Sequence, residues 1–251
     1  MSYDTGLKIE DFLVDSHISP RSISINPAFK EYESKAKELI EYNLTGNSKY
    51  EETESSKLLI KCKEHAKAFE KPIENKNVIG IVHPFYFVME SGKTLRDTYH
   101  PRYAEQCDEY SQNLFKLLES GIDKDKVSLV AFESLGHYAG ITSKLLETGA
   151  IDRVVFTENH SGALLHQKSA KQFHDKNMYL GGGFDTKCLT TTGSTLKNHP
   201  KRPAKISGIN GLIVTHPAYS LNDSILPEQI THVAEGKQMI TLDKLIEKFR
   251  V

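Results

Sequence analysis

The stretch Val78-Ile79-Gly80-Ile81-Val82, followed by His83 and Pro84, decides the fold class of this 251-residue chain. Its first five residues carry no polar side chain, and such a continuous run is typical of a parallel strand buried on both faces. Further apolar runs follow along the chain, at residues 127–132, 153–156, 178–180 and 212–214. We therefore expect these five segments to be strands of one sheet.

Helical patterns separate these runs, at residues 103–120, 139–147 and 163–174. Strands that alternate with helices favour right-handed crossovers and a parallel sheet covered on both faces. The sequence thus predicts a Rossmann-like, three-layer α/β/α fold with a mostly parallel sheet of about five or six strands. Residues 198–210, which hold two prolines and a basic cluster, are expected to form an exposed loop, and residues 242–249 a short terminal helix.

The amino-terminal part has a different pattern. Residues 1–76 are predicted to form an irregular segment followed by helices at 27–44 and 51–69, before any convincing strand. Two short helices bury too little apolar area to fold alone, so we expect them to pack on the core as caps. Residues 77–251 are then the α/β domain.

Composition narrows the classes of function. The chain has 32 Lys and Arg against 33 Asp and Glu, a net charge of −1, which argues against a general nucleic-acid binder. Its three cysteines lack paired spacing, so neither a disulfide framework nor a zinc ribbon is indicated. No apolar run approaches the roughly 18 residues that span a membrane, and the amino terminus has no apolar signal core. We expect a cytoplasmic protein whose partner is a small molecule, and the sequence leaves an oligomer open.

Polar side chains follow every predicted strand. They are His83 and Tyr86, then Glu133, then Glu158 and His160, then the turn at 181–188, and finally His216. In open parallel sheets, ligands bind in the crevice at the carboxyl ends of the strands. The sequence therefore predicts an active or binding site at this edge of the sheet.

The turn at residues 181–188 is the most informative of these segments. Gly181, Gly182 and Gly183 permit positive φ and a close approach to a ligand. We expect Asp185 or Thr186 to cap a following helix, whose amino end would lower the pKa of the Cys188 thiol. The backbone amides of residues 182–186 could then stabilise an oxyanion. The alternative is a tight turn around a small buried cysteine.

Residues 180–192, LGGGFDTKCLTTT, resemble the strand–turn–helix of isochorismatase-like cysteine hydrolases. The resemblance implies that Cys188 is at the nucleophile position, with Leu189 as the apolar residue after it and Thr192 as the later threonine. It also implies the three-layer α/β/α fold. The family's aspartate after the first strand is replaced here by His83, and its lysine has no counterpart at residues 157–159. The resemblance therefore implies a shared scaffold with a rebuilt or absent triad.

These observations lead to one main hypothesis. The protein is expected to be a hydrolase-like enzyme with Cys188 as nucleophile on a small amide or ester-type substrate. His83 would act as the base, and Glu133 or Glu158 would orient it. The residues expected to contact substrate are Gly181, Gly182, Gly183, Asp185, Thr186, His160, His216 and Tyr86.

Two alternatives stay open. The chain could be a non-catalytic ligand-binding protein that kept the scaffold and lost the chemistry. It could also be a metal-dependent hydrolase, because side chains of the types that bind zinc follow the strands: His83, Glu133, His160, Asp185 and His216. The main hypothesis needs no cofactor, and a divalent metal enters only under the last alternative.

Overall fold

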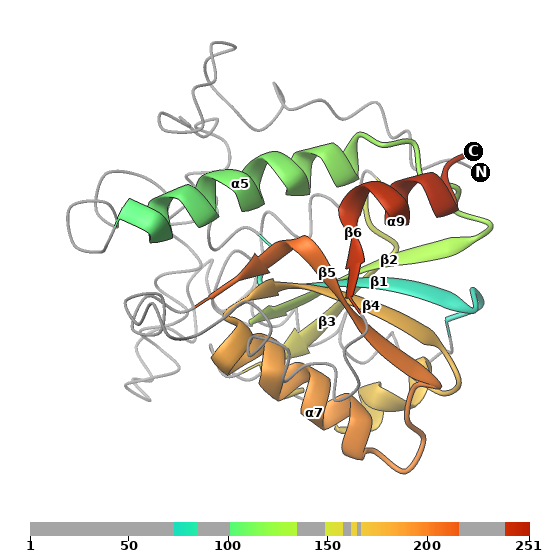
Figure 1. The fold of residues 1–251 in the computed structure, drawn as a ribbon. Helices are drawn as coiled ribbons and strands as arrows, with labels where there is room; N and C mark the ends of the chain where they lie inside the picture. Colours follow the sequence, from blue (N-terminus) through green and yellow to red (C-terminus); the bar gives the residue numbers. More distant parts are fainter. Residues whose placement is uncertain (1–72, 85–100, 135–148, 158–161, 165–166, 216–238) are drawn as a thin grey trace, which may run out of the picture.

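The structure is a computed structural model, and it describes residues 73–84, 101–134, 149–157, 162–164, 167–215 and 239–251. Its centre is a six-stranded sheet in the order β3-β2-β1-β4-β5-β6, in which every neighbouring pair is parallel (Figure 1). This is the strand order of a doubly wound sheet. The predicted fold class is confirmed.

The elements of the sheet and its covering layers have the following bounds. The strands are β1 (Asn77–Val82), β2 (Val127–Ser134), β3 (Arg153–Thr157), β4 (Asn177–Gly183), β5 (Lys205–Val214) and β6 (Met239–Thr241). The helices are α5 (Pro101–Leu118), the 3₁₀ helix η4 (Gln167–Phe173), the π-helical turn η5 (Asp185–Leu189), α7 (Thr190–Asn198) and α9 (Leu242–Phe249).

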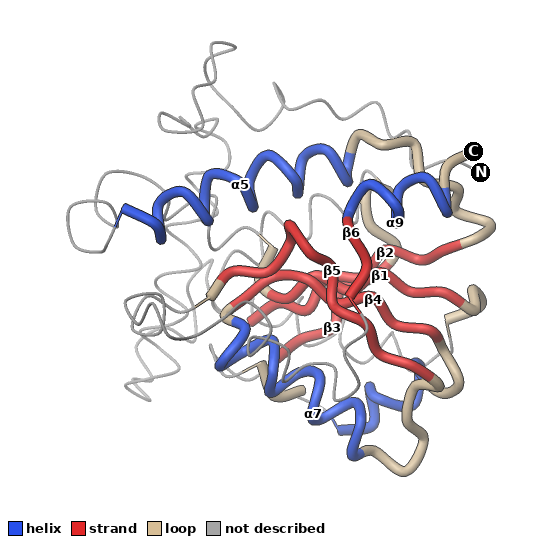
Figure 2. The backbone as a smooth tube through the Cα atoms, in the orientation of Figure 1, coloured by secondary structure: helices blue, strands red, loops and turns tan. Residues whose placement is uncertain are grey.

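Helices cover both faces of the sheet. Helices α5 and α9 lie on one face and α7 on the other, as Figures 1 and 2 show. The chain moves from β1 to β2 in one direction and from β4 to β5 in the opposite direction. Crossovers between parallel strands are right-handed as a rule, and this rule puts the helices of these two connections on opposite faces. The apolar stripe of α5 that faces the sheet consists of Tyr103, Cys107, Tyr110, Leu114 and Leu117.

The core under α7 fixes the turn that carries Cys188. Side chains from four strands meet there, among them Val82, Phe132, Val155 and Leu180. Leu189 and Leu196, which are fully buried, join this cluster from η5 and α7. Burial of each such side chain contributes roughly 1.5–3 kcal/mol, so the segment after β4 is anchored on both sides of Cys188.

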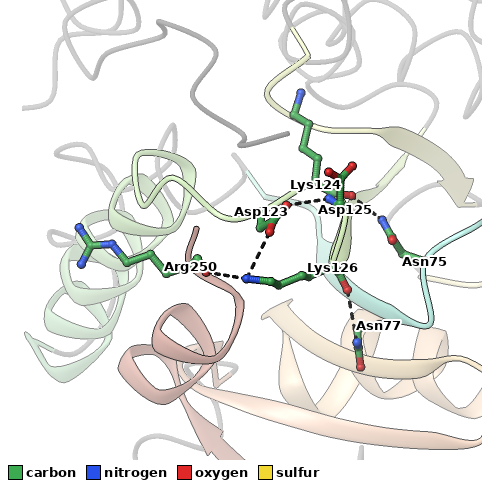
Figure 3. A network of polar contacts seen from close by, with 7 residues as sticks. All are labelled: Asn75, Asn77, Asp123, Lys124, Asp125, Lys126 and Arg250. Carbon is green, nitrogen blue, oxygen red and sulfur yellow. Dashed lines mark hydrogen bonds and ion pairs between the residues drawn. The ribbon is translucent and has the colours of Figure 1, made fainter.

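A polar network lies at the amino-terminal edge of the sheet, where strands β1 and β2 begin (Figure 3). The Asn75 amide donates to the carbonyl of Lys124 at 2.7 Å, before β2 begins. The Lys126 ammonium lies 3.2 Å from the Asp123 carboxylate and donates to the carbonyl of Arg250 at 3.1 Å. The network joins the starts of β1 and β2 to the end of the chain.

The structure corrects three sequence predictions. Residues 205–210, expected within a loop, belong to β5, and the short β6 was not predicted. The expected helix at 163–174 is only the 3₁₀ helix at 167–173. The loop prediction failed because β5 bulges opposite β4, where Gly211 takes φ of 90° and its carbonyl accepts from Asn113 at 2.9 Å. Such a bulge interrupts the apolar pattern of a strand.

The predicted helices at 27–44, 51–69 and 139–147 lie outside the described residues, as does most of the predicted amino-terminal unit. Within the described ranges, no helix combines the length and the apolar character needed to cross a lipid bilayer.

Candidate functional site

The strand order has one switch point, between β1 and β4. Strands β1 and β4 are neighbours, but the chain leaves them toward opposite edges. At such a switch point the two following connections diverge, and ligands bind between them at the carboxyl ends of the strands. His83 follows β1 and Phe184 follows β4. The candidate site is therefore built from these two strand ends.

Gly182 brings the two strand ends close together. It pairs with Val82 in the sheet and adopts a φ of 101°. A Cβ atom at this position would lie 2.0 Å from the carbonyl oxygen of Val82. Only glycine fits both the conformation and the space. Its neighbours Gly181 and Gly183 complete the end of β4.

Cys188 lies in the π-helical turn η5, and its side chain is buried, with 5% of the residue exposed. Burial raises the pKa of its thiol. Hydrogen bonds from the backbone of Phe184 and of Cys188 itself, and the charge of Lys187, lower that pKa without offsetting the burial. The expectation that a helix start would depress the thiol pKa is therefore wrong, because desolvation disfavours the thiolate more strongly.

The connection between β3 and β4 lies directly on this turn. A Cβ at Gly162 would come within 2.1 Å of the carbonyl oxygen of Cys188. The Thr192 hydroxyl, on α7, donates to the carbonyl of Gly162 at 2.7 Å. Gly162 thus packs against the backbone of Cys188, and Thr192 holds it there.

His83 reaches across the end of β2 toward β3. It has a φ of 50°, and its Nε2 lies 3.2 Å from the Thr157 hydroxyl. Thr157 is two residues after Val155 in a strand, so both side chains point to the same face of the sheet. Val155 belongs to the core cluster that contains Cys188. The buried His83 ring is therefore on the face of the sheet that carries Cys188.

Glu133 is fully buried on the other face. The preceding residue, Phe132, belongs to the cluster with Cys188, and successive side chains of a strand alternate between faces. Glu133 instead acts on Tyr110 of α5, whose pKa is raised by burial and further by the nearby Glu133 charge. The structure thus does not bring Glu133 together with Cys188.

Asp185 differs from its predicted role. The residue before η5 has no side-chain cap, and Asp185 caps no helix. Its side chain is buried, with only 1% of the residue exposed, and neither carboxylate oxygen has a hydrogen-bond partner in the described part of the chain. Burial raises the pKa of this carboxyl from 3.8 to about 7. The cap prediction for Asp185 is wrong.

The remaining predicted residues are only partly placed. The backbone of Thr186 lies in η5. Tyr86, Glu158, His160 and His216 lie outside the described residues. Across the ranges that the structure describes, no three His, Cys, Asp or Glu side chains gather in a way that could hold a metal ion. The metal hypothesis depended on His160 and His216, so it stays a prediction.

Two groups at the site were not predicted. Thr157 contacts His83, and it directly precedes the predicted Glu158, so its place at a strand end was a usable signal. The rings of Phe184 and Tyr103 pack with centroids 6.1 Å apart, which brings the start of α5 to the turn after β4. No local sequence pattern pairs residues this far apart in the chain.

Comparison with known proteins finds no matching family model, no matching curated protein and no matching solved structure. The isochorismatase-like resemblance therefore stays a prediction from residues 180–192.

Proposed function

We propose that this protein is a hydrolase-like enzyme that uses Cys188 as a nucleophile on a small amide or ester-type molecule. The observation that supports it is the position of Cys188 in the turn directly after β4, at the switch point of a doubly wound sheet. Backbone hydrogen bonds from Phe184 and Cys188 already reach the sulfur. Donors so placed could also stabilise an oxyanion that forms beside that sulfur.

The resting thiol is protonated, because burial raises its pKa. It therefore needs a base at the moment of attack. His83 is the base that we assign, since it is buried on the same face of the sheet. When Nε2–H donates to Thr157, the lone pair of the ring is on Nδ1, where it can accept the thiol proton. In this proposal Thr157, rather than Glu133, orients His83.

The reaction would follow in two steps. The thiol proton moves to His83, the sulfur bonds to the substrate carbonyl carbon, and the leaving group departs with the proton from His83. A water molecule then attacks the thioester, gives its proton to His83, and releases the acid and the Cys188 thiol. No oxidant or metal ion takes part in this balance.

The experiment is acyl transfer from a chromogenic ester such as p-nitrophenyl acetate, with the acyl group located by peptide mass spectrometry. We expect the acetyl group on Cys188, and we expect C188S to lose it. C107S is the matched control, because Cys107 is also a buried cysteine outside any disulfide but lies on α5. Acetylation of Cys107 or of surface lysines alone would contradict the proposal.

A non-catalytic binding protein is the second candidate, and the burial of Cys188 favours it. Under that function C188S would bind small molecules as well as the natural chain, and no acyl-cysteine would form. The two functions thus predict opposite results in the acyl-transfer experiment.

We further propose that the protein works in a cytoplasmic, reducing setting with a small molecule as its partner. Cys107 and Cys188, the two cysteines in the described ranges, form no disulfide there, as reducing compartments favour.

A further inference from the structure

Asp185 is an unusual group for the interior of a protein. Both of its oxygens are buried, and within the described ranges neither has a hydrogen-bond partner. Among the described residues, burial is the only cause of its raised pKa, and no nearby charge of theirs compensates the carboxylate. Lys187, in the same turn, is exposed. An unpaired buried carboxylate costs several kcal/mol, and an unsatisfied group of this kind needs an explanation.

Its position suggests what satisfies it. Asp185 comes two residues after the end of β4, at the switch point where the proposed substrate binds. The adjacent Phe184 ring packs with Tyr103. A buried carboxylate without a partner at such a place is suited to a cationic nitrogen group, which forms charge-assisted hydrogen bonds with it.

We infer that Asp185 binds a positively charged nitrogen group, an ammonium, amidinium or guanidinium, on the molecule held at this site. If the proposed hydrolase function holds, this molecule is the substrate, a small amide or ester that carries such a cation. The binding of the cation by Asp185 does not itself depend on that function. A neutral donor would leave the charge of the carboxylate uncompensated, so charge rather than shape should decide affinity.

Methylguanidinium and methylurea are the probes, because the two molecules have nearly the same shape and differ in charge. Binding is measured by protein NMR titration at about pH 8, where Asp185 is mostly ionised given its pKa of about 7. We expect methylguanidinium to bind at least about thirtyfold more tightly than methylurea, as loss of a buried charge pair usually implies. D185N should abolish this preference.

Two further variants separate the outcomes. D175N makes the same chemical change at an exposed aspartate near the opposite edge of the sheet, and it should keep the preference. C188S should also keep it, because this variant removes the nucleophile and leaves Asp185 intact. Failure of acyl transfer with a retained preference would count against the proposed function alone. Equal binding of the two probes by the natural chain, or an unchanged preference in D185N, would overturn the assignment of Asp185.

Discussion

At the scale of single residues, Asp185 lowers the stability of the fold at neutral pH. Its pKa in the folded protein is about 7, above the ordinary 3.8, so the folded state keeps a proton that the unfolded chain has already released. The contribution of Asp185 to stability is therefore most favourable at acidic pH and becomes less favourable as the pH rises toward 7. The full effect corresponds to about 4 kcal/mol. Groups at functional sites often carry such a cost.

The variant D185N tests this effect. The free energy of unfolding of D185N minus that of the natural chain should increase by up to about 4 kcal/mol between about pH 4 and about pH 8. Urea denaturation at the two pH values measures it. The packing of the new asparagine side chain contributes equally at both pH values, so it cancels when the two differences in unfolding free energy are compared. A difference that stays constant between them would show that Asp185 does not titrate as a buried carboxyl.

Gly182 offers a second test at this scale. In G182A, the new Cβ would meet the Val82 carbonyl oxygen, in addition to the strain at a φ of 101°. We expect a loss of more than about 3 kcal/mol in the free energy of unfolding. G121A is the matched control, because Gly121 also has a positive φ but nothing lies within 4 Å of its Cβ position. It should lose about 1 kcal/mol, and equal losses would contradict the close approach of β1 and β4.

The position of Cys188 after a strand could be predicted from the sequence, but its buried environment could not. A glycine run before a cysteine at a strand end is a local pattern, and it correctly placed the turn after β4. The burial of Cys188 depends on residues distant in the sequence, among them Val82, Phe132 and Val155 of the core cluster. That burial raises the pKa of the thiol, which is why the expected low thiol pKa was wrong.

At the scale of elements, helix α7 anchors Gly162, which packs against the turn that contains Cys188. The Thr192 hydroxyl donates to the carbonyl of Gly162, whose backbone lies against Cys188. T192V keeps the shape of the side chain and leaves that buried carbonyl without this donor. We expect a loss of about 1–3 kcal/mol and faster alkylation of Cys188, measured by iodoacetamide labelling and mass spectrometry.

T195V is the control for that change. The Thr195 hydroxyl donates to the carbonyl of Thr191 within α7 itself, so its removal leaves the contact with Gly162 intact. Labelling of Cys188 should stay at the rate of the natural chain in T195V. Equal rates in T192V and T195V would mean that this hydrogen bond does not control access to the thiol.

The sequence predicted strands correctly where burial determines the pattern of apolar and polar residues. Strand β1 is buried on both faces, so its residues form an uninterrupted apolar run. Strand β6 has three residues, too few for any period to emerge, and the pattern of β5 is broken by Gly208, Asn210 and Gly211 at its bulge. Strand β5 is stabilised by pairing with β4 and β6, and β6 is stabilised by pairing with β5. The sequence pattern of one segment does not show which strand it pairs with.

At the scale of the whole molecule, the two edges of the sheet have separate roles. The amino-terminal edge carries the polar network of Figure 3 and the end of α9. There Phe249 is buried, packs edge-on against Tyr179 and accepts from the Asp123 amide at 2.8 Å through its carbonyl. The carboxyl-terminal edge carries the candidate site. Stability and chemistry should therefore respond to different substitutions.

F249A tests this separation. We expect a loss of about 3–5 kcal/mol in the free energy of unfolding, as for other buried phenylalanines, with unchanged labelling of Cys188 under native conditions. V251A, at an exposed terminal position, should leave both quantities unchanged. A large change in Cys188 labelling in a still-folded F249A protein would show that the two edges are coupled.

If His83 activates Cys188, as proposed, the pH dependence of Cys188 alkylation reveals it most directly. We predict that the rate rises through the range near neutral pH in which imidazoles lose their proton, and then levels off. H83N should lose this rise, while C107S should keep it. The alternative result is a rate that stays low until above about pH 9, because it depends only on ionisation of a thiol whose pKa burial has raised. That result would show that His83 does not activate Cys188.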